Sequence, residues 1–148
     1  MPEVGAPDDV AHVIQVALTP VFLLTGVSGL LDVFNARLMR IAGRADTVAE
    51  LLRNSTDKSE RARLKAQFAQ LARRIFLLDL AIALGALGGA ATGGATFTLF
   101  IGGLRDAVVA STLFILFGGG VICIFLALAA FLTEMILAWR ELARAGSR

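Results

Sequence analysis

The chain has 148 residues, of which 57% are hydrophobic and only 18% are charged, and its mean hydropathy is +0.76. Soluble domains average about 45–50% apolar and about 25% charged residues. This composition excludes a disordered tail and a typical soluble enzyme, and a single cysteine excludes a disulfide scaffold. The net charge is +2, but the charges are unevenly distributed: the charged side chains of residues 1–10 are all acidic, and residues 35–74 carry most of the basic ones.

Three segments are long and apolar enough to cross a bilayer, which takes about 20 mostly apolar residues. They are predicted as transmembrane helices over residues 11–34, 75–104 and 105–138. The tail before the first of them, residues 1–10, is acidic rather than basic. A cleaved signal peptide would carry a basic start, so we interpret the first segment as a membrane span.

Basic residues are concentrated between the first two spans. Residues 35–74 contain 10 basic and 4 acidic side chains, and the tail over residues 139–148 contains 3 more arginines. Because lysine and arginine favour the cytoplasmic side, the N-terminus is expected outside and the C-terminus in the cytoplasm. The sequence therefore predicts a multi-pass protein of the cell inner (cytoplasmic) membrane.

The basic segment, residues 35–74, is predicted to form a cytoplasmic helical hairpin. Apolar residues recur at spacings of three or four on both sides of a break at residues 54–57. The second of these rows runs Leu64, Phe68, Leu71 and Ile75. Asp57 followed by Glu60 resembles a capping box that opens the returning helix.

The basic residues of this segment have two possible interpretations. One is the ordinary positive-inside signal on a solvated helix face. The other is binding to anionic lipid headgroups or to a cytoplasmic partner, with Arg61, Arg63 and Lys65 as the contact residues. Nucleic acid is not an expected partner, because the segment contains no recognisable nucleic-acid-binding motif.

Small residues mark candidate packing faces in the second and third spans. Gly85, Gly89 and Gly93 repeat every four residues, and Gly119 lies within a run of three glycines. Such rows let helix backbones approach closely in lipid. The contact is expected either between the spans of one subunit or between subunits of a homo-oligomer.

Three acidic residues lie near the cytoplasmic ends of the spans: Asp32, Asp79 and Glu134. Ionisable groups at membrane depth usually pair or face water. One expectation is structural pairing, for example of Asp32 with Arg37, or of Glu134 with Arg73 or Arg74. The other is a ring of acids at the mouth of a pore, which would favour monovalent cations.

The first span also carries a polar line. Gln15 and Thr19 lie four residues apart on one face and are further candidates for an ion pathway. Enzyme motifs are absent: one histidine and one cysteine build no metal or nucleophile cluster, and no phosphate-binding loop is present. No enzymatic activity, metal or other cofactor is therefore expected.

Two blocks of sequence point to a family. The TPVFLLTG stretch over residues 19–26 leads into NARLMRI over residues 35–41 and then Arg44. This order resembles a bacterial family of small three-span membrane proteins catalogued as domain of unknown function 2721. The paired Arg73 and Arg74 before the second span, and Glu134 near the end of the third, are similar to that family too. The resemblance implies an architecture and no established activity.

The predicted fold is therefore all-α and integral to the membrane, with three transmembrane helices, a cytoplasmic hairpin between the first two, and homo-oligomeric assembly. The leading hypothesis for function is an oligomeric pore for small ions that prefers cations. The alternative is a non-conducting membrane scaffold or accessory subunit, whose basic hairpin binds anionic lipid or a cytoplasmic partner.

Overall fold

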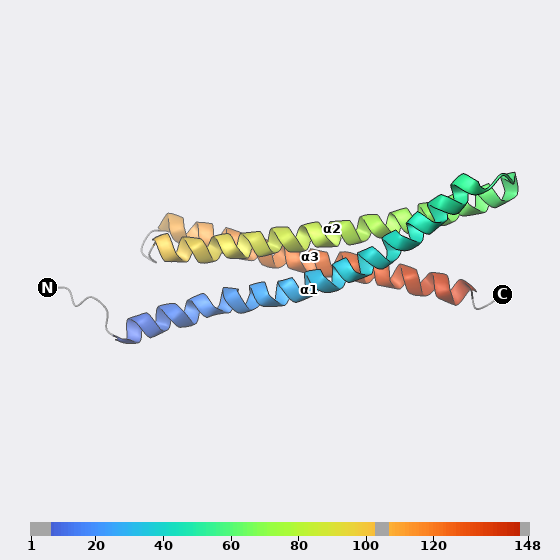
Figure 1. Ribbon diagram of the computed structural model, residues 1–148. Coiled ribbons are helices and arrows are strands. Elements are labelled where there is room, and N and C mark those ends of the chain that lie inside the picture. Colours follow the sequence, from blue (N-terminus) through green and yellow to red (C-terminus); the bar gives the residue numbers. More distant parts are fainter. Residues whose placement is uncertain (1–6, 103–106, 146–148) are drawn as a thin grey trace. The chain divides into compact units, whose positions relative to one another are not determined.

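The protein folds into three long helices in the computed structural model, which describes residues 7–102 and 107–145 (Figure 1). They are α1 (Pro7–Asn54), α2 (Lys58–Gly102) and α3 (Ala107–Ala145). Each contains a stretch long and apolar enough to cross a membrane, within Leu18–Asn54, Lys58–Thr98 and Ser111–Arg140. The all-helical class with three such helices is confirmed, whereas the cytoplasmic placement, the hairpin and the oligomer stay predictions.

The helices are longer than the predicted spans. α1 joins the first span to the start of the basic segment without interruption, and Pro20 lies inside it. α2 likewise joins the end of the basic segment to the second span. The parts of the tails over residues 1–6 and 146–148, and the connection at residues 103–106, lie outside the described residues.

The connection between α1 and α2 falls where the sequence predicts a break. Only residues 55–57 separate the two helices. Asp57 precedes α2, and its carboxylate accepts hydrogen bonds from the Ser59 amide at 3.2 Å and the Ser59 hydroxyl at 2.7 Å. This satisfies an amide at the start of α2 that has no partner within the helix. Glu60 does not close a capping box with Asp57 and instead accepts a hydrogen bond from the Ser55 hydroxyl.

The chain divides into two compact units. The first unit takes α1 up to Leu30, α2 from Gly85 and α3 up to Ile124, and the second unit takes the remainder of each helix. Helix packing in the first unit involves glycine, and in the second unit it involves charged and aromatic side chains.

Buried positions on every helix follow a period of seven residues. On α1 they are Pro20, Val27, Phe34, Ile41 and Ala45; on α2 they are Leu78, Ala81, Gly85, Gly88, Thr92 and Ala95; on α3 they are Gly120, Ile124, Ala127 and Glu134. Spacings of three, four and seven are those of helices that pack with left-handed, coiled-coil geometry. Many of these residues are small, as expected where helices associate in lipid through close packing.

The row predicted on the early part of α2 is half in register with this pattern: Leu64 and Leu71 lie 14 and 7 residues before the buried Leu78, whereas Phe68 and Ile75 do not share its face. Phe68, assigned to the apolar stripe, is 40% exposed. Arg74 rather than Ile75 lies four residues before the buried Leu78, and therefore shares its face. The last position of the row was wrong because apolar character selected Ile75, while the helix geometry brings the charged Arg74 to the packed face.

Candidate functional site

The most distinctive group in the second unit is a buried ionic cluster around Glu134. The Glu134 side chain is fully buried, and its two oxygens are shared between arginines from the other two helices. Arg37 of α1 donates its Nε to Oε2 at 2.6 Å. Arg74 of α2 donates its Nε to Oε1 at 2.9 Å and its Nη2 to the same oxygen at 2.8 Å. One carboxylate thus connects all three helices.

The helix pattern explains how these residues meet. Glu134 lies seven residues after the buried Ala127 on α3, and Arg74 lies four residues before the buried Leu78 on α2. Both charged residues therefore occupy positions that otherwise hold apolar or small side chains. Arg37 lies three residues after the buried Phe34 and flanks the same face of α1.

An aromatic pair lies beside the cluster. The rings of Phe34 and Phe131 stack with centroids 4.5 Å apart and planes at 26°. The Arg37 guanidinium carbon lies 5.9 Å from the centroid of the Phe131 ring, within the range of a cation–π interaction. Arg37 is thereby held between a carboxylate and an aromatic face.

The electrostatics of the cluster favour a structural role. Removing a carboxylate from water costs several kcal/mol, which is offset only when its oxygens are fully hydrogen-bonded. Both Glu134 oxygens are bonded, and among the described residues no buried side-chain nitrogen or oxygen lacks a partner. Two guanidinium groups and one carboxylate leave a net charge of +1. The acid is therefore compensated by two cations and has no exposed surface to offer a passing ion.

The structure selects among the predicted ion pairs. Glu134 pairs with Arg74, as one expectation had it, and not with Arg73, which is exposed. The suggested pairing of Asp32 with Arg37 is wrong, because Arg37 pairs with Glu134. The physical reason is helical geometry: at about 100° per residue, a separation of five places two side chains roughly 140° apart around α1.

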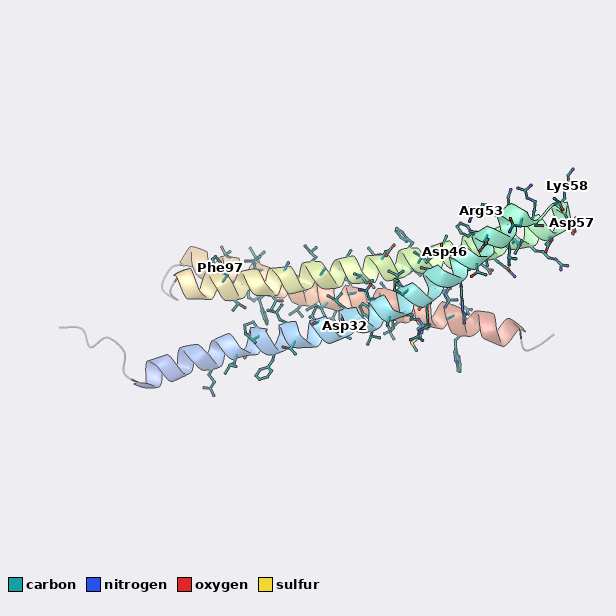
Figure 2. All side chains as sticks on the ribbon, viewed as in Figure 1. Asp32, Asp46, Arg53, Asp57, Lys58 and Phe97 are labelled. Carbon is teal, nitrogen blue, oxygen red and sulfur yellow. The ribbon has the colours of Figure 1, made fainter. Side chains whose placement is uncertain are left out.

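The two other acidic ion-pathway candidates do not join the cluster. Asp32, labelled on α1 in Figure 2, is exposed, as is Asp79 on α2. Within the described part of the chain neither carboxylate has a hydrogen-bond or ion-pair partner. Gln15 and Thr19 are also exposed on α1. The structure thus brings neither Asp32 nor Asp79 to Glu134.

Close helix packing in the first unit uses two glycines that neighbour the predicted ones. A methyl group at Gly88 would lie 2.8 Å from the Gly120 carbonyl oxygen, and one at Gly120 would lie 3.0 Å from that of Gly88. Gly89 has ordinary contacts with α1, and Gly85 is buried.

A methyl group added at Gly93 or at Gly119, in contrast, would meet no other helix within 4 Å. Their predicted part in packing therefore stays a prediction for contacts with another chain. Thr92, which donates its hydroxyl to the Gly88 carbonyl at 2.8 Å, fills the next buried position on α2.

The basic segment exposes most of its charge. Eight of its basic side chains are exposed, including the predicted contacts Arg61, Arg63 and Lys65, and all four of its acids are exposed as well. The labelled residues Arg53, Asp57 and Lys58 lie around the connection between α1 and α2 (Figure 2). The exposed surface of the segment therefore carries a charge of +4.

A pocket of about 420 Å³ opens between α1 and α2 within the second unit. Its polar lining consists of Arg44, Thr47, Gln67, Gln70 and Arg74. Sequence reasoning missed this pocket, because only the pairing of the two helices brings residues 44–48 next to residues 67–74. A metal site is not part of the arrangement: the described residues contain no group of three or more histidine, cysteine or acidic side chains able to hold an ion.

By length and composition, the three apolar helices are candidate membrane spans, as in a multi-pass helical membrane protein. The chain belongs to the family described as "Protein of unknown function (DUF2721)", whose model matches residues 17–144. The resemblance found in the sequence is thereby confirmed. Neither a curated protein nor a solved structure matches the chain.

Proposed function

We propose that this protein is a non-conducting membrane scaffold or accessory subunit that binds anionic lipid through its basic segment. The observation that carries the proposal is the state of Glu134. The acid best placed for a cation pathway is fully buried and bonded to two arginines, so it connects the helices and is not open to ions. The proposed function involves no chemistry on a substrate.

The charge distribution supports lipid as the partner. With the N-terminus outside and the C-terminus cytoplasmic, the basic segment faces the anionic cytoplasmic leaflet. Its exposed surface carries eight basic side chains against four acidic ones. Each juxtamembrane lysine or arginine near such a leaflet contributes about 1 kcal/mol to lipid attraction, less at high ionic strength.

Trp139 offers a direct test, because it is the only tryptophan and its side chain is 79% exposed. In bilayers that contain brominated lipid, quenching of Trp139 fluorescence reports which lipids surround this part of the protein. We expect brominated phosphatidylglycerol to quench more strongly than brominated phosphatidylcholine. Replacing Arg61, Arg63 and Lys65 with glutamine should remove most of that preference.

The matched control replaces three exposed, uncharged residues of the same helix, Ala66, Ala69 and Ala72, with serine and should leave the preference unchanged. Equal quenching by both lipids in the wild type would overturn lipid binding and direct the search to a cytoplasmic protein partner. An unchanged preference in the triple-glutamine variant would overturn the assignment of those three residues.

An oligomeric, cation-preferring pore is the second candidate, favoured by Asp32 and Asp79. Both carboxylates are exposed on apolar helices, where they need water or a neighbouring subunit. The test is ion flux into liposomes under K⁺, Na⁺ and Cl⁻ gradients, with empty liposomes as the control. Flux whose selectivity changes in Asp32→Asn or Asp79→Asn would establish the pore and overturn the non-conducting scaffold.

A further inference from the structure

The geometry points to the pocket between α1 and α2 as a discrete site for the phosphate group of an anionic phospholipid. This inference rests on the proposed function and deepens it, since it assigns one headgroup to one pocket rather than to the basic surface as a whole. Four observations carry it: the donors in the pocket, its charge, its depth, and its apolar wall.

Three of the residues that line the pocket carry donors with no partner among the described residues. Arg44 has no hydrogen-bond or ion-pair partner among the described residues, and the same holds for the amides of Gln67 and Gln70. A guanidinium presents its N–H groups in a planar fork that matches two phosphate oxygens, and each glutamine amide adds two donors. Thr47 differs, because its hydroxyl donates to the Gly43 carbonyl at 3.0 Å.

The charge of the pocket favours an anion. None of its lining residues is acidic, and two are arginines. Arg74 remains bonded to Glu134, so its contribution is electrostatic. Arg37, Arg74 and Glu134 together carry a charge of +1, and Arg44 raises this to +2 around the pocket. Among these four charged side chains, Arg44 is the one that bonds the phosphate directly in this proposal.

The depth of the pocket matches the headgroup region. Trp139 lies five residues beyond Glu134 on α3, about 7.5 Å further along the helix axis at 1.5 Å per residue. Exposed tryptophans of membrane helices gather at the level of the headgroups. Arg44 and Gln67 each lie seven residues from the arginine of their own helix that bonds Glu134, about 10 Å along the axis. The pocket therefore extends from the ionic cluster to the level of Trp139 and slightly beyond.

The pocket also has an apolar wall that a free anion does not need. Val48 and Leu71 line it alongside the polar groups. A volume of about 420 Å³ exceeds that of a lone phosphate and lies within the usual range for small-molecule sites, about 300–1,000 Å³. The combination suits a phosphate with its glycerol attached. A phospholipid at the membrane surface presents such a group at this depth.

The test is native mass spectrometry of the purified full-length protein in detergent, titrated with phosphatidylglycerol, phosphatidylcholine or glycerol 3-phosphate. Two variants alter the pocket: Arg44→Gln removes the unpaired guanidinium, and Gln70→Glu places an acid among the donors. Each has a matched control outside the pocket, Arg53→Gln for the first and Ala69→Glu for the second. Circular dichroism confirms that each variant keeps its helix content.

We expect one tightly retained phosphatidylglycerol in the wild type, with affinity at least tenfold weaker in both pocket variants and less than threefold weaker in both controls. Equal losses in variants and controls would overturn the pocket and leave general binding to the basic segment intact. No preference for phosphatidylglycerol in the wild type would overturn the proposed lipid binding together with the pocket. Binding of glycerol 3-phosphate as tight as that of the lipid would overturn the lipid as the source of the phosphate.

Discussion

Replacing Glu134 with glutamine tests whether the ionic cluster is structural. The substitution keeps the shape of the side chain, removes its charge and turns one accepting oxygen into a donating amide, so one of the two arginines loses its acceptor and both lose the negative charge. Removing one partner of a buried ion pair costs about 3–5 kcal/mol. The two arginine side chains are 27% and 14% exposed, and water relieves part of their loss. We therefore expect destabilisation near the lower end, about 3 kcal/mol.

The assay is thermal unfolding of the purified protein in one fixed detergent. For a chain of this size, each kcal/mol corresponds to about 2–4 °C, so Glu134→Gln should lower Tm by about 6–12 °C. Asp79→Asn is the matched control, because it neutralises an exposed carboxylate and should shift Tm by no more than about 2 °C. A double variant with Arg37→Gln should lose less than the sum of the single losses.

Two results would refute this reasoning. One is a Tm for Glu134→Gln that matches the Asp79→Asn control, which would show that the buried carboxylate does not hold the helices together. The other is a folded Glu134→Gln protein that conducts ions with altered selectivity. That result would place Glu134 in an ion pathway and favour the pore over the scaffold.

Two further predictions concern other parts of the fold. Gly88→Ala should destabilise the protein by about 1–3 kcal/mol in the same unfolding assay, since the new methyl group would lie 2.8 Å from the Gly120 carbonyl oxygen. Gly93→Ala is the control and should be neutral or stabilising, because its new methyl group would meet nothing within 4 Å. Equal changes in stability for the two variants would contradict close helix packing at Gly88. Hydrogen bonds from Ser59 lower the pKa of Asp57, so the stabilising cap is present above the ordinary value of 3.8 and is lost as the pH falls through the lowered pKa. Amide-exchange protection at the start of α2 should therefore fall in strong acid, whereas Asp57→Asn should show no such pH dependence.

The family and the helical class were predictable because they depend on local sequence. Length and apolar content alone identify three membrane-length helices, since a span needs only about 20 apolar residues in a row. The break at residues 54–57 was also readable, because polar turn and capping residues interrupt the periodic pattern there. These features depend on neighbours in the chain and not on how the helices pack.

The partners of Glu134 and the glycine contacts depend on how the helices are rotated about their axes. A shift of one residue turns a side chain by about 100°, so the sequence alone did not distinguish Gly88 from Gly89, or the inward position of Arg74 from that of Ile75. The apolar character of Ile75 and the regular spacing of Gly85, Gly89 and Gly93 favoured these residues for the packed face. Packing of the three helices selected a different face, one that places a carboxylate between two arginines. Sequence therefore determined which helices form and where they break, and the tertiary structure decided which residues meet, because those contacts require the relative rotation of all three helices.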